Sequence, residues 1–100
     1  MGMEEPRRSE LLQLGREAVA QAPGAAAVEQ IEVEAGPDSS NEPAYRFTFL
    51  VNRIPDEVEP IELYLNVIQY LRNELLSRND EHYPYIRMLN QNDWLRRAGA

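Results

Sequence analysis

The chain contains no cysteine and no lysine, and His82 is its only histidine. Without thiols it cannot form disulfides, use a thiolate nucleophile, or bind zinc or an iron–sulfur cluster through sulfur. Without lysine it cannot form a lysine Schiff base. A metal site with two histidine ligands is excluded, and a Ser-His-Asp relay would depend on His82 alone. The chain therefore lacks a residue type that most enzyme classes require, and we expect no catalytic residue, no cofactor and no metal.

The chain also lacks an apolar run approaching the roughly 18 to 20 residues that cross a bilayer. Its charged first ten residues are not followed by the apolar region of a signal peptide. We therefore expect no membrane partner and no secretory signal. The absence of cysteine is compatible with a cytoplasmic location. A length of 100 residues with 43% hydrophobic content predicts one folded domain rather than a disordered chain.

Acidic residues outnumber basic ones by 17 to 10, which gives a formal net charge of −7. The basic doublets, Arg7-Arg8 and Arg96-Arg97, lie near the two ends. Nucleic acid is disfavoured as a partner, because phosphate binding requires a clustered basic face. The segment from Ile54 to Glu62 carries acids and no base: Asp56, Glu57, Glu59 and Glu62. These carboxylates either stabilise the N-terminus of a following helix or attract a basic partner.

The periodicity of apolar residues predicts the elements and their order. We expect residues 1–8 to form a flexible lead and residues 9–100 to form a single α+β domain. Ser9 is the expected N-cap of the first helix. Helices are predicted at 9–22, at 61–76 and at the C-terminal end, where residues 90–93 are expected to cap a short helix. Strands are predicted at 31–35, 45–51 and 83–89, and a hairpin loop at 36–43. The order α-β-β-α-β-α predicts a two-layer sandwich, with a small, mainly antiparallel sheet packed on helices.

The predicted helix at 61–76 is apolar over well more than half of its circumference, whereas an ordinary amphipathic stripe covers about 100° or more. In so short a chain, the sheet and the first helix are not expected to cover all of this apolar surface. The rest is left for the C-terminal segment, a second subunit or a partner protein. Tyrosines beside an arginine have the composition of interface hot spots, although tyrosines at the margin of a core look the same. The predicted interface draws on the helix, the last strand and the acidic segment: Leu63, Val67, Tyr70, Tyr83, Tyr85, Arg87, Asp56, Glu57 and Glu59.

A different class of function would use arginines, whose guanidinium groups match phosphate and carboxylate geometry. Arg78 and His82 form an R-x-x-x-H pair, a spacing that occurs by chance in many chains, and Arg-His pairs serve in some metal-independent ribonucleases. The candidates for an anion site are Arg46, Arg53, Arg78, His82 and Arg87. The oxygen-rich turn at 38–42 lacks the spacing of a calcium-binding EF-hand loop, which favours a plain turn. No glycine-rich phosphate loop is present.

Two segments carry a resemblance to known proteins: Asp38-Ser39-Ser40-Asn41-Glu42-Pro43-Ala44, before an aromatic strand, and Tyr83-Pro84-Tyr85-Ile86-Arg87. They resemble a group of small uncharacterised bacterial α+β proteins, some of them encoded beside HEPN-type or nucleotidyltransferase-type partners. The resemblance implies an accessory or antitoxin-like role and transfers no catalytic residue. The leading hypothesis is a non-enzymatic protein-interaction module that homodimerises or docks on a basic protein. The alternative is a small ligand-binding or enzymatic domain that uses arginine and histidine on an anionic substrate.

Overall fold

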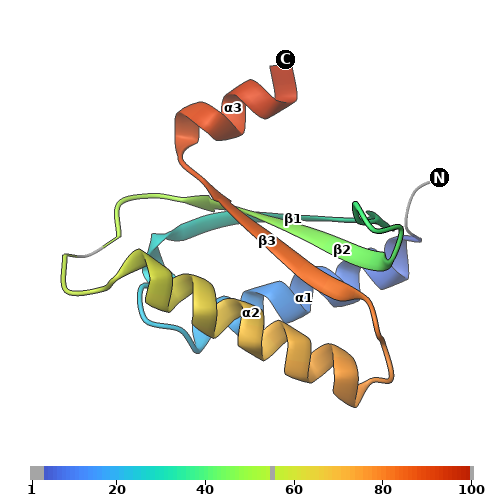
Figure 1. The fold of residues 1–100 in the computed structure, drawn as a ribbon. Helices are drawn as coiled ribbons and strands as arrows, with labels where there is room; N and C mark the ends of the chain where they lie inside the picture. The colour runs from blue at the N-terminus through green and yellow to red at the C-terminus, as the bar shows by residue number, and fades with distance from the viewer. Residues whose placement is uncertain (1–3, 55, 100) are drawn as a thin grey trace.

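Residues 4–54 and 56–99, which this computed structural model describes, form three α-helices and a three-stranded sheet in the order α-β-β-α-β-α (Figure 1). The α+β class, the element order and the strand at 83–89 are confirmed. The elements are α1 (Glu5–Ala20), a short 3-10 turn η1 (Ala25–Ala27), β1 (Val28–Pro37), β2 (Pro43–Val51), α2 (Pro60–Ser77), β3 (Tyr83–Leu89) and α3 (Gln91–Gly99).

The strands lie in the order β1-β2-β3, so β2 is central. β1 and β2 form a hairpin and pair antiparallel, whereas β2 and β3 pair parallel. The sheet is therefore mixed rather than mainly antiparallel. The reason is the 18-residue helix α2, which carries the chain back along the sheet so that β3 starts beside the start of β2.

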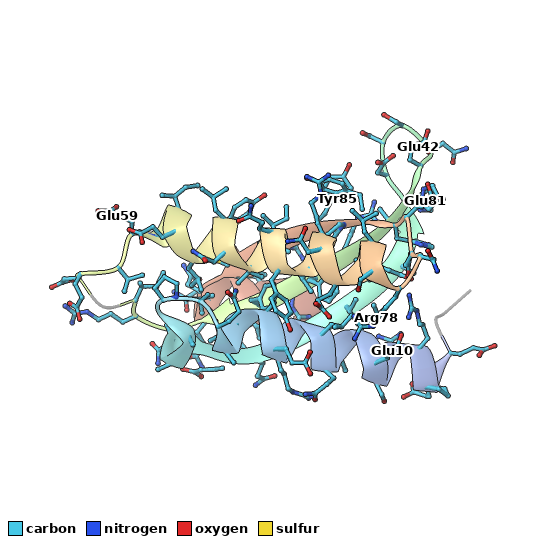
Figure 2. All side chains as sticks on the ribbon, turned by 90° about the horizontal axis from the view of Figure 1, so that it is seen from below. Glu10, Glu42, Glu59, Arg78, Glu81 and Tyr85 are labelled. Carbon is cyan, nitrogen blue, oxygen red and sulfur yellow. The ribbon has the colours of Figure 1, made fainter. Side chains whose placement is uncertain are left out.

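α1 and α2 lie side by side on one face of the sheet, α1 beneath β1 and α2 beneath β3 (Figures 1 and 2). Alternation along β2 directs Phe47 and Phe49 into the space between sheet and helices, and both side chains are fully buried. The helices complete this core with fully or almost fully buried side chains: Leu11, Leu14 and Ala18 from α1, and Leu63, Val67, Leu71 and Leu75 from α2. The core thus fixes which stripe of each helix faces the sheet.

α1 begins earlier than the sequence predicts. Its N-cap is Glu4, with Pro6 in the first turn, whereas Ser9 lies exposed inside the helix. The prediction of a flexible lead is wrong for residues 5–8, and residues 1–3 lie outside the described part of the chain. Tertiary contacts explain the longer helix, because Arg7 binds Asp80 and Arg8 Nη1 donates to the carbonyl oxygen of Val33 at 2.8 Å.

Gly15 lets α1 approach the sheet closely. A Cβ atom at this position would lie 3.4 Å from Ile31 Cγ2 and 3.6 Å from the Phe47 ring. Glycine costs an isolated helix about 1 kcal/mol relative to alanine. The close packing against the sheet offsets that cost in the folded protein.

The hairpin loop between β1 and β2 is a plain turn, as the sequence predicts. Asp38 Oδ1 accepts hydrogen bonds from the backbone N–H groups of Ser40 at 2.8 Å and Glu42 at 3.0 Å. Asn41 adopts a positive φ of 63°, which asparagine tolerates well. The Tyr85 hydroxyl donates to Asp38 Oδ2 at 2.9 Å, which ties the loop to β3.

α3 lies on the opposite face of the sheet from the other helices (Figure 1). Asn90 Oδ1 caps it by accepting from the Asp93 N–H at 2.8 Å, in agreement with the predicted cap. The register places Glu34 opposite Arg46 on the outer face of the sheet. An ion pair on this face joins Glu32 to Arg97 of α3 at 2.8 Å.

Candidate protein-interaction surface

One side of α2 exposes apolar side chains that neither the sheet nor α1 covers. Ile61 is 57% exposed, Leu65 53% and Leu76 57%. They lie on the side of the helix turned away from its buried stripe, and Tyr64 and Ile68 beside them are half-buried. We call this set the α2 flank: Ile61, Tyr64, Leu65, Ile68 and Leu76. An exposed stripe of this kind on a small domain is typical of a surface that meets another protein.

A groove of about 630 Å³ separates the α2 flank from the beginning of β3. Tyr83 supplies the β3 side, and the Arg72 guanidinium carbon lies 5.3 Å from the centroid of its ring. Tyr83 in turn packs against Tyr85, with ring centroids 4.7 Å apart. Among the described residues that line the groove, Arg72 is the one charged side chain. The groove is therefore largely apolar, with a cation–aromatic pair near the C-terminal half of α2.

Two predicted interface residues are in the core instead. Leu63 and Val67 have no exposed surface and pack beneath the sheet. The sequence shows that α2 has more apolar residues than one stripe needs, but it does not show which stripe meets the sheet. The candidate surface is therefore the α2 flank, on the side of the helix turned away from these two residues.

The predicted tyrosines divide between two places. Tyr70 is half-buried, and its hydroxyl donates to Glu17 Oε1 of α1 at 3.4 Å, so it lies at the helix–helix contact and not in the groove. Burial raises the pKa of Tyr70, as does the neighbouring Glu17 carboxylate. Tyr83 is 36% exposed and Tyr85 42% exposed. Alternation along β3 puts them on the same side of the strand as exposed Arg87, and Tyr83, at the start of the strand, also reaches Arg72 of α2.

The predicted acidic residues lie at the N-terminal end of α2. Asp56, Glu57 and Glu59 are exposed, and Glu59 is the N-cap but makes no side-chain capping hydrogen bond. Figure 2 shows Glu59 at one end of α2 and Arg78 at the other. Both interpretations from the sequence fit this position. The carboxylates are close to the positive end of the helix dipole, and they are free to meet a basic partner.

The five candidates for an anion site do not gather at one place. Arg46 and Arg87 line a depression of about 480 Å³ on the outer face of the sheet, together with Thr48 and Tyr85. Glu34 and Asp38 line the same depression, so its charged groups balance. Arg53 lies at a separate depression beside Asn90. Arg78 and His82 lie at a third, and Arg78 is paired there with Glu74 at 2.7 Å.

A polar cluster centred on Asp80 has no counterpart among the residues that the sequence pattern singles out. The Asp80 side chain is only 9% exposed. Its Oδ2 accepts from the Tyr45 hydroxyl at 2.6 Å and from Arg7, and its Oδ1 accepts from the His82 N–H at 3.0 Å and lies 2.6 Å from His82 Nδ1. Burial raises the pKa of Asp80, but the hydrogen bonds from Tyr45 and His82 outweigh it, so this pKa lies below its usual value.

His82 takes part in this cluster. Its ring stacks on the Tyr45 ring at 4.3 Å with an interplanar angle of 8°. Burial and the Asp80 hydrogen bond raise the pKa of Tyr45. The cluster joins α1 through Arg7, β2 through Tyr45, and the connection between α2 and β3 through Asp80. These contacts hold the three segments together.

Two further observations concern metal binding and membrane crossing. In residues 4–54 and 56–99, no three histidine or acidic side chains are close enough together to hold a metal ion. Within the same ranges, no helix is both long and apolar enough to cross a bilayer. In comparisons with known proteins, no family model, no curated protein and no solved structure matches this chain.

Proposed function

We propose that this chain is a non-enzymatic protein-interaction module of the cytoplasm, which binds a partner protein through the α2 flank and the adjoining groove. The observation that carries the proposal is the exposure of Ile61, Leu65 and Leu76, each more than half exposed on one helix. Burying apolar surface stabilises a complex by about 25 cal/mol per Å², before the cost of association is subtracted. Leu65 and Leu76 line the groove together with Tyr83, and this set supplies the apolar centre that protein interfaces require.

Charge favours a basic partner. The acidic segment at residues 56–62 lies at the N-terminal end of the α2 flank, and no basic residue occurs between Ile54 and Leu71. Acidic groups at the rim of an interface accelerate association with a basic protein and discriminate against acidic ones. An accessory or antitoxin-like role beside a basic protein fits this surface, as does the resemblance that suggested it. A second copy of the chain is the other occupant that the sequence suggests.

The proposal is tested by introducing charge into the α2 flank. We expect the Leu65→Glu/Leu76→Glu double variant to lose the association that the wild-type chain makes, because an interface centre tolerates no unpaired carboxylate. Association is measured by light scattering after size exclusion and by co-purification from the native cells. Circular dichroism should show an unchanged fold, since both positions are exposed.

Leu95→Glu is the matched control, because Leu95 of α3 is 61% exposed and lies on the other side of the sheet. This variant should behave like the wild-type chain. The proposal fails if the wild-type chain is a monomer at every concentration and co-purifies with the same proteins as the double variant does.

A second candidate function is the binding of a small anion on the outer face of the sheet. The observation in its favour is the depression that brings Arg46 and Arg87 together with the Tyr85 hydroxyl. This candidate predicts that inorganic phosphate at millimolar concentration shifts the amide NMR signals of both arginines, and that Arg87→Ala abolishes the shifts. Unchanged spectra would rule out anion binding at this depression. The two carboxylates in the same depression, Glu34 and Asp38, make it the weaker candidate.

A further inference from the structure

We infer that the α2 flank and β3 together receive an extended segment of the partner protein, which adds to the sheet as a fourth strand beside β3. This inference rests on the proposed function and names the form of the partner. The occupant is an extended stretch with apolar side chains at alternate positions. Its residues over the N-terminal turn of α2 are basic.

The sheet and the helical layer differ in width. Three strands about 4.8 Å apart occupy about 14 Å, whereas two helices about 10 Å across occupy about 20 Å. The helical layer is therefore wider than the sheet by about one strand. α2 lies beneath β3 (Figures 1 and 2), so the uncovered width on this side of the molecule belongs to α2.

The two edges of the sheet also differ. On the β1 side, the depression next to the strand is lined by three charged or polar side chains and by alanine, valine and isoleucine. On the β3 side, the corresponding groove also has three charged or polar side chains, but its apolar lining consists of the larger leucine, isoleucine and tyrosine side chains of the α2 flank and of Tyr83. An added strand would therefore bury larger apolar side chains at β3 than at β1.

The inner face of β3 is incompletely buried. Phe47 and Phe49 of central β2 are fully buried, whereas their β3 neighbours Ile86 and Met88 are only half-buried. A residue on the inner face of an edge strand keeps this exposure when no further strand shields it. A fourth strand would cover Ile86 and Met88 and the α2 flank at the same time.

The edge of β3 is the remaining requirement. Within the described ranges β3 pairs with β2 alone, so the other edge of this seven-residue strand offers main-chain donors and acceptors. Edge strands of this kind bind peptides by strand addition, in which main-chain hydrogen bonds give affinity and side-chain pockets give specificity. Pro84 contributes no N–H, so the donors of the edge are at the other positions.

The charges along α2 indicate which charge each end of the partner segment should carry. Four acids and no base occur between Ile54 and Leu71, whereas Arg72 is the charged residue of the groove at the other half of the helix. A segment with arginine or lysine at one end and neutral or acidic residues at the other is complementary to this distribution. A second copy joined edge to edge at β3 fits less well. The two projecting α2 helices would then compete for the same space, because the helical layer is the wider one.

The experiment uses a phage-displayed library of seven-residue random peptides, the length of β3, on the immobilised full chain. We expect enriched peptides with alternating apolar residues and a basic end, and at least about tenfold weaker binding of the best peptide to Leu65→Glu. In that peptide, N-methylation at alternate residues that face β3 should weaken binding by about tenfold or more, and N-methylation at the residues between them should not. Leu95→Glu is again the matched control.

Three results would overturn the inference: no enrichment, enriched peptides with apolar residues at helical spacing, or binding that does not depend on which alternate residues are methylated. These results are separate from failure of the proposed function. If the Leu65→Glu/Leu76→Glu variant loses its protein association but strand-adding peptides are not found, the α2 flank binds a partner through a helix or a folded surface. If neither effect is seen, both proposals fail.

Discussion

The Phe47→Ala variant is expected to lose about 3 to 5 kcal/mol of its free energy of unfolding. Phe47 has no exposed surface and lies on the central strand, where its ring lies within 3.6 Å of the position that a Cβ of Gly15 would take. Its ring centroid is 6.4 Å from that of Phe49. Removing the ring deletes apolar contacts with both layers and leaves a cavity that the paired strands cannot close. Urea denaturation followed by circular dichroism measures the loss.

This loss is a large part of the 5 to 15 kcal/mol that stabilises a typical small domain. The control is Leu95→Ala, because Leu95 is 61% exposed and its truncation should change stability by no more than about 0.5 kcal/mol. A Phe47→Ala variant that is within 1 kcal/mol of the wild-type chain would show that the core is not arranged around the central strand as described.

The Asp80→Asn variant is expected to lose about 2 kcal/mol at pH 7, because hydrogen bonds to a charged acceptor contribute about 1.5 to 3 kcal/mol. The carboxylate accepts from Tyr45, from Arg7 and from the backbone N–H of His82, and only 9% of its surface is exposed. Asparagine keeps the shape but removes the charge and one acceptor oxygen. Denaturant unfolding at pH 7 measures the difference, with Glu81→Gln as the control on the exposed neighbouring residue.

The Asp80→Asn variant also tests how the stability of the fold depends on pH. Because the pKa of Asp80 is lower in the folded state than in the unfolded state, ionised Asp80 stabilises the fold at pH values above its unfolded pKa. This stabilisation is lost as the pH falls from about 4 through the folded-state pKa, since the carboxyl is then protonated in both states. The difference between the wild-type chain and Asp80→Asn should therefore shrink below pH 4. A difference that stays constant from pH 7 to the acid limit would contradict the Asp80 cluster.

The predicted interface residues show which features of the candidate surface can be predicted from the sequence. Periodicity correctly indicates that α2 carries more apolar residues than one buried stripe needs. It names Leu63 and Val67 as interface candidates, and both are in the core. A helix that is apolar over most of its circumference can turn several ways towards a sheet. The strands and α1 together select the stripe that is buried, and the α2 flank is what remains.

The Asp80 cluster illustrates what the sequence cannot show. Arg7 and Asp80 are 73 positions apart, and nothing in either local pattern indicates their contact. The same contact explains why α1 begins at Glu5 and not at Ser9, because Arg7 is held by tertiary partners that no capping rule takes into account. Local signals predicted the hairpin turn and the Asn90 cap well, because both depend on side chains bonding to backbone only a few residues away.

The sequence by itself determined the types and the order of the elements, the turn at Asp38 and the absence of thiol, lysine and paired-histidine chemistry. These features depend on residue identity and on periodicity over a few residues. Tertiary structure alone decided that β3 joins β2 in parallel, which stripe of α2 stays exposed, and that Arg7, Tyr45, Asp80 and His82 meet. Each of these depends on how one layer is positioned against another. That position is set by the packing of the whole core, which no short stretch of sequence contains.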